Sequence, residues 1–172
     1  RPPAPPAAPG PAPRRHRPAG GGAGRGDMVE AATQDEWLEH VKGMLRSGIE
    51  VIKHPRSGKP EPRSMRLVES DTELAWVGRN GKMRVVPLEL VTSVEPGREA
   101  TAGTAAAFPS HTFERTGDLE RVGLYMSLFF EEGFSRASLD IEAPTEEVRD
   151  TLVRALRLMI PTREESLLER YK

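Results

Sequence analysis

The sequence contains no cysteine, and aromatic residues make up only 5% of it. Disulfide bonds, thiolate nucleophiles and thiolate metal sites are therefore excluded. No apolar run approaches the roughly 20 residues that span a bilayer, and the N-terminal residues lack the apolar segment of a secretory signal. The four histidines, at positions 16, 40, 54 and 111, do not have the spacing of metal ligands. We therefore expect no metal site, no cofactor and no transmembrane segment.

The chain also lacks a strong net charge, with 25 Lys and Arg against 26 Asp and Glu. Residues 1–27 hold five arginines and a single acid, Asp27, so the remaining residues carry a charge of about −5. A nucleic-acid-binding protein would need a positive excess to neutralise phosphates. The charge balance argues against that class, although a local basic patch on an acidic body remains open.

Residues 1–32 are rich in Pro, Gly, Ala and Arg. Such a segment has little apolar surface to bury and cannot offset its ordering entropy, so we expect a disordered arm. Its PxxP spacing is permissive for an SH3 ligand, but composition alone accounts for it. Because the chain begins with Arg1 rather than methionine, we expect it to be a processed chain or a piece of a longer protein.

A short amphipathic helix is predicted over residues 33–47, leading into the domain. Thr33 and Glu36 have the spacing of a capping box, and four apolar residues then fall on one helical face. Ser47-Gly48 would end the helix. The residues of the apolar face are Trp37, Val41, Met44 and Leu45.

From Ile49 the apolar period changes from helical to two, which is typical of strands. Asn80-Gly81 lies between two such segments and is a strong signal for a β-hairpin. In the last strand we expect Leu139 and Ile141 to point inward, and Asp140 and Glu142 to lie on a solvent-exposed face. The seven predicted strands cover residues 49–54, 63–68, 73–77, 83–86, 90–95, 123–130 and 136–142.

The segment 98–121 is rich in Gly, Ala, Thr and Ser and predicts a long irregular loop. Phe108 and Phe113 are its aromatic residues and are expected to anchor it to the core. A helix of about four turns should follow the strands, with Thr145 as its N-cap and Pro161 at its end. Residues 161–172 are interpreted as a tail or as the start of a following helix or domain.

Seven strands followed by one amphipathic helix predict a mainly β protein, a partly open barrel capped by a C-terminal helix. Three segments resemble the N-terminal pleckstrin homology (PH) domain of phosphoinositide-specific phospholipase C: residues 44–77, 87–99 and 127–160. The junction of residues 139–145, LDIEAPT, is the most specific part. The resemblance implies a PH domain over residues 48–160. Leu152 stands where such domains usually carry a tryptophan, which predicts altered core packing around a leucine plug.

The resemblance also implies a function, because the family binds inositol phosphates at the open end of the barrel between the first two strands. This chain would then recruit a phospholipase C-like signalling protein to membranes from the cytoplasm, as a peripheral protein. It would be the regulatory N-terminal part of such an enzyme and would itself hold no catalytic residue. Five residues are the candidate headgroup ligands: Lys53, Arg56, Lys59, Arg63 and Arg66.

The basic segment departs from the family pattern in two respects. Arg63 and Arg66 are three positions apart rather than two, and Glu61 places an acid beside them. A second interpretation therefore stays open, in which the PH fold serves as a scaffold or protein-interaction module with a degenerate lipid site. His54, next to this segment, is interpreted as a solvated strand end.

Overall fold

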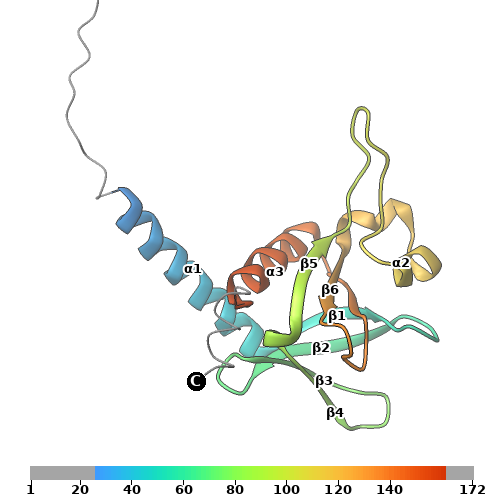
Figure 1. The fold of residues 1–172 in the computed structure, drawn as a ribbon, viewed down its shortest axis with the longest axis horizontal. Coiled ribbons are helices and arrows are strands. Elements are labelled where there is room, and N and C mark those ends of the chain that lie inside the picture. Colours follow the sequence, from blue (N-terminus) through green and yellow to red (C-terminus); the bar gives the residue numbers. More distant parts are fainter. Residues whose placement is uncertain (1–25, 162–172) are drawn as a thin grey trace, which may run out of the picture.

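The computed structural model describes the backbone of residues 26–161 and the side chains of residues 33–161. Most of the predicted N-terminal arm and nearly all of the predicted C-terminal tail lie outside these residues. Seven antiparallel strands form one sheet in the order β4-β3-β2-β1-β7-β6-β5, and the sheet is not closed by pairing of β4 with β5 (Figure 1). The strands are β1 (Ile49–His54), β2 (Glu61–Val68), β3 (Glu73–Val77), β4 (Met83–Pro87), β5 (Val91–Pro96), β6 (Tyr125–Phe130) and β7 (Ser138–Glu142).

All seven predicted strands are present, each within about two residues of its expected position. A short 3-10 helix, η1 (Leu88–Leu90), joins β4 to β5. The C-terminal helix α3 (Glu146–Met159) begins as expected, with the Thr145 hydroxyl accepting a hydrogen bond from the Val148 backbone N–H at 3.2 Å. Pro161, which cannot continue a helix, follows its end.

The N-terminal helix α1 (Gly26–Ser47) starts seven residues before the predicted start at Thr33. The capping-box pattern is a local signal, but Met28 to Ala32 contain no helix breaker, so the helix can extend through Thr33. Part of the segment expected to be disordered is therefore helical. The helix ends as predicted, because Gly48 adopts φ of +100° and turns the chain into β1.

The core lies inside the curved sheet, under α3 and the C-terminal half of α1 (Figure 1). Leu152 on α3 is completely buried within it, so a leucine fills the position expected to plug the barrel. Val41 and Leu45 bring α1 into the same core. Trp37 on α1 also stacks against Arg154 on α3, with the guanidinium carbon 4.2 Å from the ring centroid.

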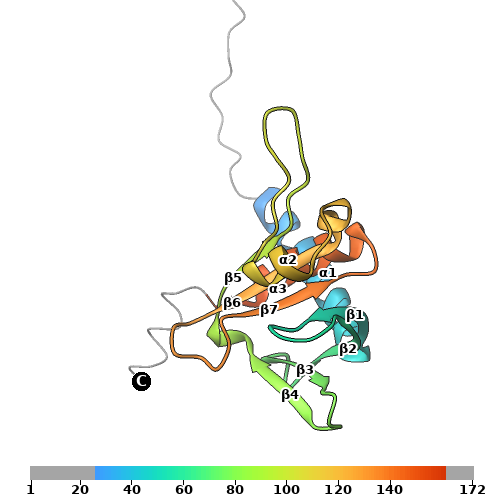
Figure 2. The same ribbon diagram turned by 90° about the vertical axis from the view of Figure 1, so that its right-hand side faces the viewer.

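The segment between β5 and β6 is more ordered than the irregular loop expected from its composition. Isolated bridges join Arg98 to Ala107 and Thr101 to Thr104 in a projecting hairpin (Figure 2). Two short helices follow, α2 (His111–Thr116) and the 3-10 helix η2 (Leu119–Leu124). Phe113 is fully buried against Tyr125 and Phe108 packs beside them, so both aromatics anchor the segment as predicted, but in a second cluster and not in the main core.

This segment covers the outer face of β6, β7 and the end of β1, which corrects three expectations. Asp140 and Glu142 are 3% and 4% exposed, although their alternation with apolar neighbours predicted a solvent-facing position, and His54, interpreted as a solvated strand end, is 3% exposed. The reason is tertiary, because a period of two identifies the face of a strand but not what covers that face. Here α2 and η2 exclude solvent from it.

The buried polar groups on this face are paired, as burial requires. Asp140 accepts hydrogen bonds from the hydroxyls of Ser127 and Ser138 at 2.7 Å, and from Ser110. His54 Nε2 lies 3.1 Å from Glu142 Oε2, and its Nδ1 lies 2.9 Å from Thr116 Oγ1. These contacts join α2 to β1 and β7.

Within residues 26–161, no helix combines the length and apolar character needed to cross a bilayer. Among the side chains of residues 33–161, no cluster of three or more His, Asp or Glu is suited to a metal ion.

Candidate functional site

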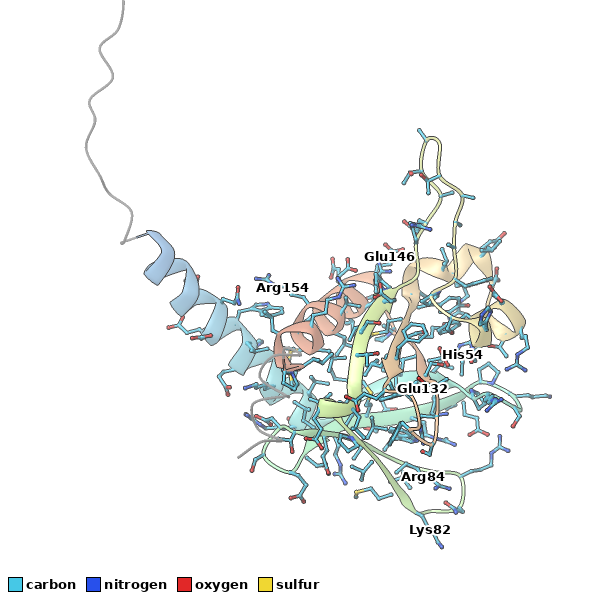
Figure 3. The ribbon with its side chains drawn as sticks, in the orientation of Figure 1. His54, Lys82, Arg84, Glu132, Glu146 and Arg154 are labelled. Carbon is cyan, nitrogen blue, oxygen red and sulfur yellow. The ribbon has the colours of Figure 1, made fainter. Side chains whose placement is uncertain are left out.

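Three connections meet at one end of the sheet, away from α1: residues 55–60, 78–82 and 131–137 (Figure 3). They come together because each joins two antiparallel strands at the same end, β1 to β2, β3 to β4 and β6 to β7. A cavity of about 440 Å³ lies among them. Its lining residues come from all three connections and from the adjoining strands, and include Ser57, Gly78 and Arg136.

The cavity is strongly cationic, since five basic side chains and one acid line it. Lys53 and Arg63 come from the paired strands β1 and β2, where Arg63 lies opposite Val51 and Lys53 lies opposite Glu61. The other three bases come from the second and third connections and from β4. The complete basic set is Lys53, Arg63, Arg79, Arg84 and Arg136.

The indole of Trp76 is part of the cavity wall. It lies on the inner side of β3, as does Leu74, and Arg84 lies directly opposite it on β4. Lys53 Nζ is 6.0 Å and the Arg136 guanidinium carbon 5.1 Å from the indole centroid. The ring face is electron-rich and attracts both cations, which are thereby held on the same aromatic surface.

Two of these bases, Lys53 and Arg136, carry a positive charge that their surroundings in the fold destabilise. Burial, followed by repulsion from Arg136, lowers the pKa of Lys53, while Asp140 partly opposes the effect. Burial and the nearby Arg84 likewise lower the pKa of Arg136. The Nε of Arg136 is also buried and has no hydrogen-bond partner. Both groups would gain from a bound anion, which would add attraction and hydrogen-bond acceptors.

Glu61 is the acid of the cavity and forms ion pairs with both Arg63 and Arg79. Arg63 also donates a hydrogen bond to the Pro62 carbonyl at 2.8 Å. Glu61 thus brings a guanidinium group of β2 and one of the β3–β4 connection together. Lys53, Arg84 and Arg136 also line the cavity, and no lining residue other than Glu61 is acidic.

The five predicted headgroup ligands are not all in one place. Lys53 and Arg63 line the cavity. Arg56 instead lines a neighbouring cavity of about 630 Å³, bounded by α2 and β7, that shares Lys53 and Arg136 with the first. Lys59 is exposed in the β1–β2 connection. Arg66 is exposed on the outer face of β2, because it alternates with the buried Met65 and Leu67.

Three basic residues of the cavity were missed from the sequence: Arg79, Arg84 and Arg136. A signal for one of them exists, since Arg79 lies in the Asn-Gly hairpin. In an antiparallel meander alternate connections lie at the same end of the sheet, so the third connection, with Arg79, falls beside the first. The same rule puts the sixth connection, with Arg136, at the other end, and only the antiparallel pairing of β7 with β1 brings Arg136 beside Lys53.

No family model matches the chain. Two solved structures from Toxoplasma gondii share its fold at low identity. Inner Membrane Complex Sub-compartment Protein 1 is 15% identical with a TM-score of 0.54, and the match covers 72% of this chain and 90% of that one. Inner Membrane Complex Sub-compartment Protein 3 is 12% identical with a TM-score of 0.52, and the match covers 76% of this chain and 87% of that one.

The structure of L. pealei PLC21 matches with 10% identity and a TM-score of 0.50. The match covers 67% of this chain but 15% of that much longer chain, in its PH domain region. At such identities the likeness concerns the fold. The strand order, the helical cap and these matches together show that the chain has a PH-like fold resembling the N-terminal PH domain of phospholipase C.

Proposed function

We propose that the cationic cavity binds the polyphosphorylated headgroup of a phosphoinositide, or the corresponding free inositol phosphate. The observation that supports this most directly is the ratio of five basic side chains to one acid around a space of about 440 Å³. The chain would recruit a phospholipase C-like signalling protein to the cytoplasmic face of a membrane as a peripheral module. Any catalysis by such a protein would lie outside this chain.

The physical basis is the charge of the ligand. Each phosphate monoester carries about −1.5 to −2 charges at neutral pH and presents three acceptor oxygens. Guanidinium groups contact such phosphates with two parallel hydrogen bonds, whereas the Lys53 ammonium acts as a point charge. Arg84 on β4 and Arg136 in the β6–β7 connection both line the cavity, so a ligand with two or more phosphates would engage both.

Isothermal titration calorimetry with soluble inositol trisphosphate tests the proposal. Reversing Lys53→Glu and Arg63→Glu together should abolish binding, because two attractive charges become repulsive. Lys59→Glu with Arg66→Glu is the matched control, since it changes the same net charge outside the cavity. Undetectable binding by the unaltered chain, or equal losses in both variants, would refute the headgroup site.

Glu61 favours a second candidate function, a scaffold or protein-interaction module whose lipid site is degenerate. Its pairs with Arg63 and Arg79 already occupy two of the cations that a headgroup would need. On this view neither soluble inositol phosphates nor phosphoinositide vesicles would bind.

The substitution Glu61→Gln distinguishes the two functions. It frees both arginines and removes the repulsive charge, so a working headgroup site should bind inositol trisphosphate about tenfold more tightly, the effect of about 1.4 kcal/mol. Calorimetry of the variant beside the unaltered chain measures the difference. If Glu61→Gln and the unaltered chain both fail to bind, the scaffold interpretation is favoured.

A further inference from the structure

The outer face of the β3–β4 hairpin exposes three apolar side chains close to the cationic cavity. Val77 and Met83 are each 51% exposed, and Val85 is 38% exposed. Val77 lies opposite Met83, and Ala75 lies opposite Val85. The intervening Leu74, Trp76 and Val86 are buried, so the three exposed side chains share the outer face. β4 is an edge strand, and the β3–β4 hairpin lies at the lower side of the molecule in Figure 3.

Basic residues surround this apolar surface. Arg66 on β2 lies on the same outer face, opposite Ala75 on β3, which in turn lies opposite Val85 on β4. Arg79 and Lys82 are exposed in the connection between Val77 and Met83. Acids lie near this surface as well: Glu73 shares the outer face of β3 and lies opposite Pro87, while Glu61 is paired with Arg63 and Arg79.

We propose that the β3–β4 hairpin inserts Val77 and Met83 into the interfacial region of an anionic bilayer while Arg66, Arg79 and Lys82 contact its phosphates. The inference rests on the headgroup proposal above and names the membrane lipid, rather than a free inositol phosphate, as the physiological ligand. Gly78 and Arg79 line the cavity and also follow Val77 directly, so one hairpin joins the headgroup site to the apolar surface.

The combination of exposed apolar and basic side chains fits a bilayer because each kind of side chain is stabilised at a different depth of the membrane interface. Apolar side chains are stabilised at the boundary between headgroups and acyl chains, and neighbouring lysines and arginines reach the phosphates with their polar ends. A surface of this kind binds weakly by itself, so the cationic cavity would supply specificity and the hairpin additional affinity. A protein strand added to the β4 edge is the competing occupant, and the experiment below separates the two.

The absence of cysteine allows a direct test with the full chain. Met83→Cys, labelled with an environment-sensitive fluorophore, reports insertion of the hairpin. Leu158→Cys on α3, 41% exposed at an apolar position outside the hairpin, is the matched control. The probes are vesicles of phosphatidylcholine alone, with phosphatidylserine, or with phosphatidylinositol bisphosphate, and soluble inositol trisphosphate.

We expect a blue shift of the label at position 83 with anionic vesicles, and none with soluble inositol trisphosphate or at position 158. Co-sedimentation with anionic vesicles without a blue shift at position 83 would overturn the insertion while leaving the headgroup site intact. A blue shift with phosphatidylserine vesicles, combined with no binding of inositol trisphosphate, would support insertion and refute the headgroup site. No association with any anionic vesicle would overturn the insertion, and strand addition to β4 would then be favoured.

A second measurement separates insertion from electrostatic attraction. Val77→Thr with Met83→Gln keeps side-chain size and charge but makes both groups polar. The double variant should bind anionic vesicles about tenfold more weakly, in line with the loss of buried apolar groups. Its affinity for soluble inositol trisphosphate should be unchanged. Unaltered vesicle affinity in this variant would overturn the proposal.

Discussion

At the scale of single residues, the positive charge of Lys53 destabilises the folded protein. Its ammonium group lies against Trp76, with Arg63 and Arg136 close enough to repel it. Burial and these neighbours lower its pKa, so the folded chain binds this proton less tightly than the unfolded chain does. Residues with such a cost are common at functional sites, where a ligand relieves it.

Replacing Lys53 with methionine should therefore stabilise the protein at neutral pH, by about 1 kcal/mol. A base whose pKa is lowered by folding reduces stability at every pH below the lowered pKa, and the loss disappears as pH rises toward 10.5. The gain from Lys53→Met should shrink over that range. Urea unfolding at pH 7 and pH 10 measures it, and exposed Lys59→Met is the control. A Lys53→Met variant less stable than the unaltered chain at pH 7 would contradict the prediction.

How far the site could be predicted also depends on individual residues. Lys53 and Arg63 were placed from the resemblance to PH domains, and the inward side of β2 brings Arg63 to the cavity. Arg66 could not be distinguished from Arg63 by charge, but its alternation with Met65 places it on the opposite face. Arg84 carries no comparable local signal, because its role follows from lying opposite Trp76 across the β3–β4 pair.

At the scale of elements, the segment between β5 and β6 determines how the sheet is covered. Its aromatic cluster of Phe113, Val122 and Tyr125 packs on the outer face, separate from the main core. Phe113 stacks on Tyr125 with ring centroids 4.2 Å apart, and His54 contacts both rings. His54 is thus both an aromatic and a hydrogen-bonding contact between this segment and the sheet.

The substitution His54→Ala should destabilise the protein by about 2–4 kcal/mol, since it opens a cavity and removes one hydrogen-bond partner from each of Glu142 and Thr116, which keep their contacts to Arg121 and to the Thr112 carbonyl. Residues 98–124 should then become the first segment cut in limited proteolysis. Thermal unfolding and mass spectrometry of the cleavage products measure both effects. His111→Ala, at a side chain that is 97% exposed, is the control. An uncut segment in a destabilised His54→Ala variant would show that other contacts hold it in place.

The elements themselves could be predicted well, because strand and helix positions depend on local periodicity and on caps such as Thr145. The segments that cover these elements could not be predicted in the same way. The burial of Asp140 and Glu142 results from a segment that begins about forty residues earlier in the chain and folds back over β7. No pattern within SLDIE distinguishes a strand face covered in this way from one exposed to water.

At the scale of the whole molecule, positive charge is concentrated at one end of the sheet. The complete chain carries a net charge of about −1, yet one end of the sheet concentrates five basic side chains around a cavity. The field of such an end is local, because ions screen it over about 8 Å at physiological ionic strength. It would orient the module as it approaches an anionic surface without making the whole protein adhere to one.

Association with vesicles containing phosphatidylinositol bisphosphate should therefore depend steeply on salt. Raising NaCl from 0.05 to 0.5 M should slow association by about tenfold and change dissociation much less, because screening acts on the approach. Surface plasmon resonance on captured vesicles separates the two rates. A loss confined to the dissociation rate would show that the charges act only after contact.

Because β6 is covered on one face by the main core and on the other by the aromatic cluster, its amides should exchange slowly. β6 pairs with β5 on one side and β7 on the other, and five of its six residues are buried, between the main core and the aromatic cluster. Its amides have no route to solvent through local opening, so they should exchange with deuterium only when the whole domain unfolds. Their exchange would then report the global free energy of unfolding, with β6 as the slowest-exchanging segment of the protein.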